Sequence, residues 1–169
     1  CEVAGVIVDG LPAYDDLQVA LDAAAPGAVV EVCPGTWFGT FEAPVALALV
    51  SVAGAAATTL HANHAGPALV LPAGSTVTGF TVTDGDGGSG GGIVALGDVD
   101  VVDCVITGNE AIFGGGVSVA AGTATFPGTT VSANTAVTGG GIHAGPGVVL
   151  DLTGATVDGN VATDAGGVY

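Results

Sequence analysis

Lysine and arginine are absent from this chain of 169 residues, which has 16 acidic residues and a formal net charge of −16. A protein that binds nucleic acid neutralises phosphates with lysine and arginine, and attraction to anionic lipid needs the same side chains. We therefore expect no nucleic acid among its partners. Charged residues make up only 9% of the chain, so its solubility must rest on small polar side chains and on the backbone.

A long apolar helix is missing as well. The most apolar stretch, Val45 to Leu60, contains serine, threonine and glycine, and it is shorter than the roughly 20 residues that a membrane-spanning helix needs. We expect no transmembrane segment. The 31 glycines also exclude a long helix bundle, because glycine destabilises helix interiors. The hydrophobic content of 49% is ample for the core of one domain.

One phrase is repeated through the second half of the chain. It reads apolar-x-x-Asn-x-Ala-x-x-(Gly/Ala)-Gly-Gly-apolar and occurs at 106–117, 131–142 and 157–168. An earlier copy at 82–93 has Gly85 in the asparagine place, and the copies follow one another in steps of 24, 25 and 26 residues. Such a period is typical of a solenoid, in which each coil buries its apolar face only against its neighbours.

The positions of each repeat predict how the coil is built. Three columns before the asparagine are predicted to point inward: Val77, Val101, Phe126 and Leu152; Phe80, Cys104, Thr129 and Ala155; Val82, Ile106, Val131 and Val157. A bend between two strands is predicted at Gly79, Asp103, Gly128 and Gly154. Because alternate side chains of a strand face opposite sides, the next column points outward: Thr81, Val105, Thr130 and Thr156. We expect three strands per coil.

Only one helix is predicted, over Asp15 to Ala25. Apolar residues recur there at helical spacing, between two aspartates and a Pro-Gly pair. A solenoid exposes strand edges at its ends, so we interpret this helix as the cap of the first coil. Residues 1–26 then form an N-terminal extended segment and capping helix, and residues 27–169 form the repeats. The predicted fold is all-β, a right-handed parallel β-helix solenoid of five to six coils.

Two sets of motifs carry a resemblance. The helix pattern L-Q-x-A-x-D-A-A, then Pro-Gly, a valine-rich strand and Pro-Gly-Thr-Trp at 34–37 resemble the opening of secreted right-handed parallel β-helix proteins of the pectin-lyase-like superfold. The Gly-Gly-Gly-apolar and apolar-x-x-Asn phrases are similar to the repeats of polymorphic outer-membrane proteins, with isoleucine or valine where that family usually has phenylalanine. The resemblance implies this fold and a secreted or cell-surface location. It implies almost nothing about activity.

Three carboxylates form the candidate metal site. Asp84 and Asp86 lie in a glycine-rich stretch, and Glu110 occupies the same place in the next coil as Asp86. Like charges one strand spacing apart repel each other, and hard oxygen ligands on such a loop suit Ca²⁺. The alternative is a corner of solvated carboxylates. No other cofactor is expected.

The asparagines of the repeat, Asn109, Asn134 and Asn160, are expected to be structural rather than ligands. Asparagine tolerates the left-handed backbone of a corner, and its amide can bond the equivalent amide of the next coil.

Histidines and aromatic residues gather before the repeats. His61 and His64 lie in a loop with nothing in the sequence to bring them together as zinc ligands. Trp37, Phe38 and Phe41 can stack on sugar rings, but we favour a role in filling the junction between the cap and the first coils.

The three cysteines receive separate interpretations. Cys104 falls in an inward column and is expected to be a buried free thiol. Cys1 and Cys33 both lie near the cap, so a disulfide between them is one prediction. The other is that Cys1 is the lipidated first residue of a processed lipoprotein.

Two classes of function remain. The first is a non-catalytic extracellular structural protein, a rod that associates with itself head-to-tail into a surface filament or acts as an adhesin. The alternative is a polysaccharide-binding or polysaccharide-hydrolysing protein with carbohydrate as its partner. A uronate lyase needs a basic side chain, and lysine and arginine are absent. A hydrolase needs clustered carboxylates, and acids do crowd two successive coils: Asp84, Asp86, Asp98, Asp100, Asp103 and Glu110. We expect no enzyme.

Self-association is predicted from the two ends of the repeat array. No polar cap follows the last phrase, and an open coil edge is a template for another strand. The extended segment Cys1 to Gly10 is expected to cover such an edge in a neighbouring copy, which would give a head-to-tail filament.

Overall fold

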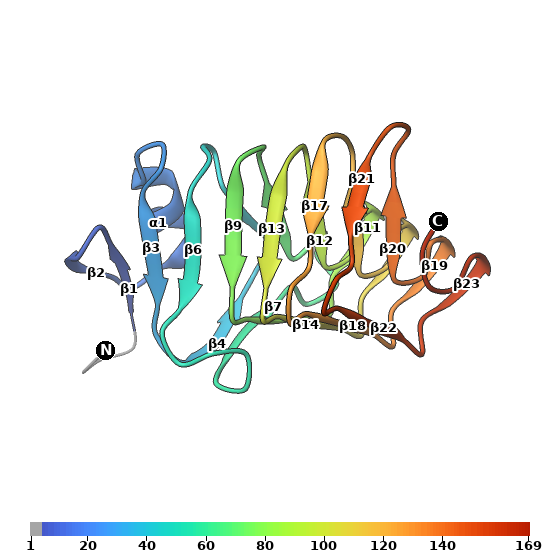
Figure 1. Ribbon diagram of the computed structural model, residues 1–169. Helices are drawn as coiled ribbons and strands as arrows, with labels where there is room; N and C mark the ends of the chain where they lie inside the picture. Colours follow the sequence, from blue (N-terminus) through green and yellow to red (C-terminus); the bar gives the residue numbers. More distant parts are fainter. Residues whose placement is uncertain (1–4) are drawn as a thin grey trace.

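The computed structural model describes residues 5–169, which form a β-solenoid of about five turns with one short helix at its N-terminal end (Figure 1). Parallel strands of successive coils pair in register and make four walls. The predicted all-β parallel β-helix with an N-terminal capping helix is confirmed. No helix within residues 5–169 is long and apolar enough to cross a membrane.

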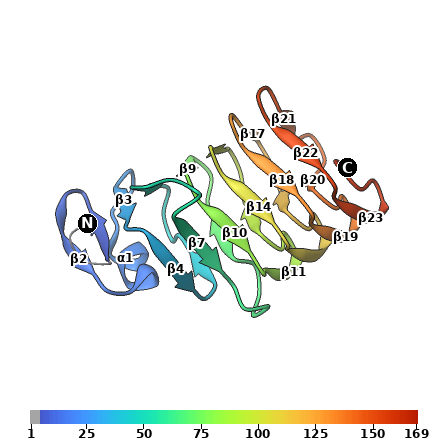
Figure 2. The same cartoon turned by 90° about the horizontal axis from the view of Figure 1, so that it is seen from below.

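Each wall is one sheet, numbered here in the order in which the chain visits it. Wall 1 has the order β2 (Leu11–Tyr14), β1 (Val6–Val8), β3 (Val29–Val32), β6 (Ala48–Ser51), β9 (Ser75–Thr78), β13 (Val99–Val102), β17 (Thr123–Thr125) and β21 (Val149–Asp151). Wall 2, which runs across Figure 2, contains β4 (Gly35–Phe38), β7 (Thr58–His61), β10 (Thr81–Thr83), β14 (Val105–Thr107), β18 (Thr130–Ser132) and β22 (Thr156–Asp158).

The other two walls close the coil. Wall 3 contains β11 (Asp86–Ser89), β15 (Glu110–Phe113), β19 (Thr135–Thr138) and β23 (Val161–Asp164). Wall 4 contains β5 (Phe41–Glu42), β8 (Leu69–Leu71), β12 (Ile93–Ala95), β16 (Val117–Val119) and β20 (Ile142–Ala144).

The prediction of three strands per coil is wrong for most of the solenoid. It holds for the coils before Asp84, where no wall 3 strand is found among the described residues, but the later coils have four strands. The additional strand follows the asparagine of each repeat. Its alanine column, Ala111 and Ala136, is buried and pairs in register, so the chain makes a further extended segment there instead of a loop.

The three inward columns are confirmed by burial. Every member from Val77 to Val131 is at most 1% exposed, and Leu152, Ala155 and Val157 pack against this core while partly exposed. The predicted bend also appears, because the residues between walls 1 and 2 have left-handed backbone, with φ of 75° at Gly79, 49° at Asp103, 67° at Gly128 and 78° at Gly154.

The outward column of wall 2 extends further than the repeat predicts. Thr36 pairs with Thr59 and Thr59 with Thr81, so two more threonines precede the predicted ones. Counting back from the asparagine could not find them, because their coils lack the repeated phrase.

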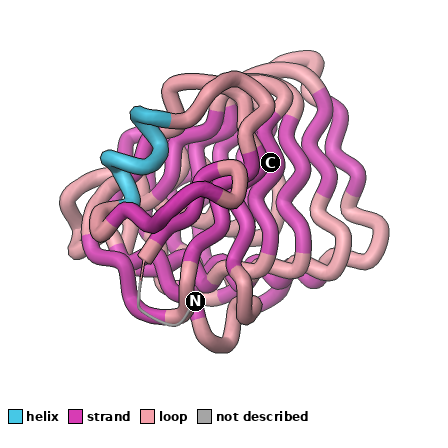
Figure 3. Tube along the Cα trace, turned by 90° about the vertical axis from the view of Figure 1, so that its left-hand side faces the viewer, coloured by secondary structure: helices cyan, strands magenta, loops and turns pink. Residues whose placement is uncertain are grey.

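The N-terminal cap combines a helix, a hairpin and a side-chain amide. Helix α1 (Leu17–Ala23) begins after Asp16, whose side chain accepts the N–H of Val19, and it buries one apolar face. Gln18 Oε1 accepts the N–H of Glu42 and Gln18 Nε2 donates to its C=O, both at 2.9 Å. The amide therefore takes the place of a neighbouring strand at the edge of wall 4. Figure 3 shows the helix against this end of the coils.

Residues 6–8 of the opening segment are paired within their own chain, and residues 1–4 of that segment lie outside the described residues. Strand β1 pairs antiparallel with β3 and with β2 of its own chain, so residues 6–8 are already used to cover wall 1. They are not available to cover the edge of a neighbouring copy.

Substitution of Val131 by aspartate tests the inward columns. Val131 is 0% exposed in the core, so a buried carboxylate without a partner should lower the free energy of unfolding by about 4 kcal/mol or more. Urea denaturation followed by circular dichroism measures the change. The control Thr130→Asp puts the same charge on the outer face one residue away and should have a much smaller effect. Equal stability of the two variants would contradict the assignment of the columns.

Candidate functional site

A buried asparagine ladder holds the corner between walls 2 and 3. Asn109 Nδ2 donates to Asn134 Oδ1, and Asn134 Nδ2 donates to Asn160 Oδ1, each at 3.0 Å. The same amides donate to backbone C=O groups of the preceding coil, and their oxygens accept backbone N–H groups. The structural interpretation of the three asparagines is therefore confirmed.

The left-handed backbone at this corner does not belong to the asparagines, as the sequence suggested. It belongs to the residue before each of these positions, with φ of 55° at Asp84, 67° at Gly108, 55° at Ala133 and 62° at Gly159. The asparagine itself is then free to point inward and meet its copies.

The Gly-Gly pair of each repeat leaves room for this ladder. A Cβ atom at Gly116 would lie 2.7 Å from the backbone oxygen of Gly141 and 2.9 Å from Asn134 Nδ2. Any other residue would push the two coils apart or displace the amide. The glycines and asparagines of the repeat thus form one structural unit.

Replacement of Asn134 by alanine should destabilise the protein strongly. Its side chain donates to Ile106 O and Asn160 Oδ1 and accepts two N–H bonds from Asn109. Alanine would leave these buried groups without partners, at a cost of about 2–4 kcal/mol in the free energy of unfolding. The exposed neighbour Thr135, replaced by alanine, should change the same urea midpoint little. A normal midpoint for Asn134→Ala would show that the ladder is dispensable.

The three carboxylates of the candidate calcium site are only partly brought together. Asp86 and Glu110 pair across neighbouring strands of wall 3, as the repeat predicts. Asp84 instead contacts His61 and His64. Across residues 5–169, no group of three or more His, Cys, Asp or Glu residues is arranged to hold a metal ion. Calcium binding stays a prediction, supported by a two-carboxylate pair rather than by three ligands.

Both histidines converge on Asp84, a contact that no sequence motif predicts. His61 Nε2 lies 2.8 Å from Asp84 Oδ2, and His64 Nε2 lies 3.7 Å from Asp84 Oδ1. Asn63 N–H donates to His61 Nδ1 at 3.3 Å, which leaves the proton on Nε2 facing the carboxylate. His61 pairs with Thr83 across β7 and β10, so the next residue, Asp84, lies beside the imidazole. The contact can therefore be found only once the register of the coils is known.

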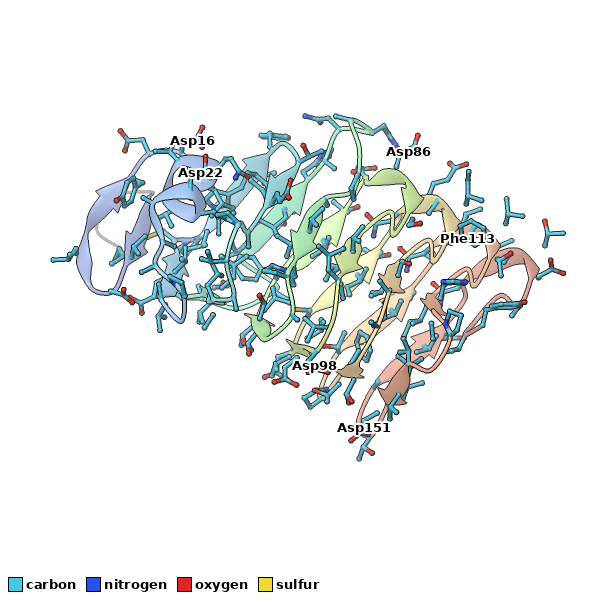
Figure 4. The ribbon with its side chains drawn as sticks, turned by 90° about the horizontal axis from the view of Figure 1, so that it is seen from above. Asp16, Asp22, Asp86, Asp98, Phe113 and Asp151 are labelled. Carbon is cyan, nitrogen blue, oxygen red and sulfur yellow. The ribbon has the colours of Figure 1, made fainter. Side chains whose placement is uncertain are left out.

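The other acids that a hydrolase would use are divided between walls. Asp98 Oδ1 accepts the N–H of Thr123 at 2.7 Å and Asp100 Oδ1 accepts the hydroxyl of Thr125 at 2.6 Å, both beside wall 1. Figure 4 shows Asp86 along one side of the solenoid and Asp98 along the other. The six acids that crowd two coils in the sequence therefore do not face one another as a single cluster.

Aromatic side chains line a cavity of about 350 Å³ between the cap and the first coil. Trp37, Phe38 and Phe41 contribute to it from β4 and β5, and Asp15 and Asp16 contribute from the start of α1. Phe41 is buried, whereas Phe38 is 64% exposed. The predicted role of filling the junction between the cap and the first coil therefore fits Phe41. The exposed ring of Phe38 is free to contact another molecule.

A second aromatic group lies at the other end of the solenoid. The ring of His143 is stacked on Tyr169, with centroids 5.6 Å apart, and tilted against Phe113 at 5.2 Å. Beside it, exposed apolar side chains lie on the strands of wall 3. We call this surface the apolar patch: Ile112, Phe113, Val137 and Val161. Nothing in the repeat pattern marks it, because these positions vary between copies.

Cys104 is a buried free thiol, as predicted. Its Sγ donates to Val102 O at 3.2 Å, and burial raises the pKa of the thiol to about 11. Cys33 is also buried. Cys1 lies outside the described residues, so both its pairing with Cys33 and its lipidation stay predictions.

Cys104 should resist alkylation in the folded protein. Because its pKa lies above the ordinary 9.0, the thiol is protonated at pH 8 and hardly nucleophilic. Iodoacetamide should label it only after denaturation, as read by mass spectrometry of the peptide. The same shift makes the folded state bind more protons between pH 9 and 11, so stability should fall as pH rises through this range. Rapid native labelling would contradict the assigned burial.

No protein family, curated protein or solved structure matches this chain. The likeness to parallel β-helix proteins therefore rests on the motifs and on the fold itself.

Proposed function

We propose that the protein is a non-catalytic extracellular structural protein that acts as an adhesin, with the solenoid as a rigid support and the apolar patch as the adhesive surface. The apolar patch is the observation that carries this proposal. Ile112, Val137 and Val161 are 51%, 50% and 62% exposed on adjacent strands. Ile112 and Val137 lie side by side across β15 and β19, and Val161 lies diagonally from Val137 on β23, opposite Thr135. Neighbouring exposed apolar side chains on an ordered surface are typical of interaction sites.

The apolar patch cannot be explained as displaced core. The alanine column of the same strands, Ala111 and Ala136, occupies the inward side, and the Asn ladder fixes the corner that precedes each strand. Rotation of Ile112 or Val137 inward would require the strand to slip by one residue, which would break the register with both neighbours.

The charge of the chain supports a location outside the cell. Trypsin-like proteases cleave after lysine and arginine, and both are absent. The partner surface expected is apolar and neutral or basic, since a net charge of −16 repels acidic surfaces at low salt.

Carbohydrate binding is the second candidate, and the aromatic group beside the apolar patch favours it. Phe113 and Tyr169 are 42% and 60% exposed around His143. Exposed rings of this kind can stack on the apolar faces of sugars.

Head-to-tail self-association has less support in the fold. Strand β2 has a neighbour on one side only among the described strands, but it contains Pro12. Proline lacks an N–H group and protects edge strands against pairing. We therefore treat self-association as an outcome of the test below.

The double variant Ile112→Ser/Val137→Ser tests the adhesin proposal. Binding to alkyl-coated, carboxyl-coated and cellulose-coated sensor surfaces is compared with that of Val149→Ser, a control at an equally exposed valine on wall 1. Loss of two half-exposed apolar side chains should weaken binding to the alkyl surface about tenfold, and the control should not. Sedimentation shows whether the same residues hold copies together.

Three results would refute it. Unchanged alkyl binding by the double variant removes the apolar patch from adhesion. Selective binding to cellulose that survives the double substitution points to the carbohydrate alternative. If the original protein forms oligomers at high concentration and the double variant does not, the apolar patch serves self-association.

A further inference from the structure

The cavity beside the cap helix has the make-up of a binding site for a cation. It is bounded by Asp15 and Asp16 on one side and by Thr36, Trp37 and Phe38 on the other, with Phe41 at its base. Its volume of about 350 Å³ is at the small end of the range of ligand pockets, about 300–1,000 Å³. Acidic and aromatic residues therefore line the same hollow.

The aromatic side is fixed in position. Trp37 Nε1 donates to Cys33 O at 3.1 Å, which orients the indole. The Phe38 ring rests against the His61 imidazole, with centroids 5.2 Å apart, and His61 is in turn held by Asp84 at 2.8 Å. A ligand would meet rings that are already in place, so little conformational entropy is lost on binding.

The acidic side lacks a counter-charge. Asp16 uses Oδ1 to accept the N–H of Val19, which positions its carboxylate. Within residues 5–169 neither Asp15 nor Oδ2 of Asp16 has a hydrogen-bond partner. Both side chains are exposed, and the whole sequence offers no lysine or arginine for them, so they are accessible to a cation from outside the chain.

We propose that this cavity binds an alkylammonium group, either in a small quaternary amine or in a lysine side chain. Aromatic faces attract such cations through their π electrons, and carboxylates close by add Coulomb attraction. The alkyl groups around the nitrogen can pack against the aromatic rings. A bare metal ion has no such apolar surface and would not contact the rings. A neutral sugar could stack on Phe38 but would leave both carboxylates uncompensated.

The fluorescence of Trp37 reports on the site directly, because it is the single tryptophan of the chain. Choline is titrated into the full chain at low salt, alongside its uncharged isostere 3,3-dimethylbutan-1-ol and glucose. A second arm compares a peptide carrying one lysine with its acetylated form, to separate a small-molecule source from a protein source. We expect saturable changes with choline or the lysine peptide, weakened by added salt.

Asp15→Asn/Asp16→Asn removes the charge while asparagine keeps the N-cap, so the helix should persist. This variant should lose at least tenfold in cation affinity, and Phe38→Ala should lose severalfold. Asp22→Asn, on the same helix outside the cavity, and Ile112→Ser/Val137→Ser should bind normally. The latter control separates this inference from the adhesin proposal.

Several outcomes would overturn the assignment. Equal binding of choline and its neutral isostere would show an apolar pocket without charge recognition. Saturable binding of glucose alone would identify a sugar site. Choline binding unchanged in both cavity variants, or no saturable change at all, would also reject it.

Discussion

The close packing of the Gly-Gly pairs, which connect walls 3 and 4, against the asparagine ladder is the constraint on which the rest of the solenoid depends. Backbones can approach to strand spacing there only because glycine leaves no Cβ, and a Cβ at Gly116 would meet Asn134 and the next coil. The asparagine amides then satisfy backbone groups that the turn leaves inside, at Val82, Ile106 and Val131. The glycines of the repeat leave the space, and its asparagines supply the hydrogen bonds.

This arrangement separates stability from surface chemistry. The inward columns and the ladder fix each coil, so outward positions change from copy to copy without cost to the fold. Wall 3 shows the result: Glu110, Thr135 and Val161 occupy equivalent places on neighbouring strands. A support of this kind can present an acidic pair, a polar residue and an apolar patch side by side, which suits a protein that works through its surface.

The cap and the first coil together form a cavity that the repeats alone do not form. Gln18 closes the edge of wall 4 by imitating a strand, and α1 stands against the first coil, where Trp37 and Phe38 project. A cavity arises at this junction because a helix and a coil edge differ in shape.

The repeated phrase was enough to predict the parallel β-helix, its inward columns, the bends at Gly79 and Gly128, the buried Cys104 and the structural role of the asparagines. These features follow from a repeated pattern, and a pattern states which residues occupy equivalent positions. The folded chain was needed to reveal that Asp84 contacts His61, that β1 pairs within its own chain, and that Asp15 shares a cavity with Phe38. Apart from Asp84, which stands in the copy at 82–93, those contacts join residues outside the repeated phrase. Their positions depend on strand register and on the fit of the cap, which are set by packing in three dimensions and leave no periodic signal in the chain.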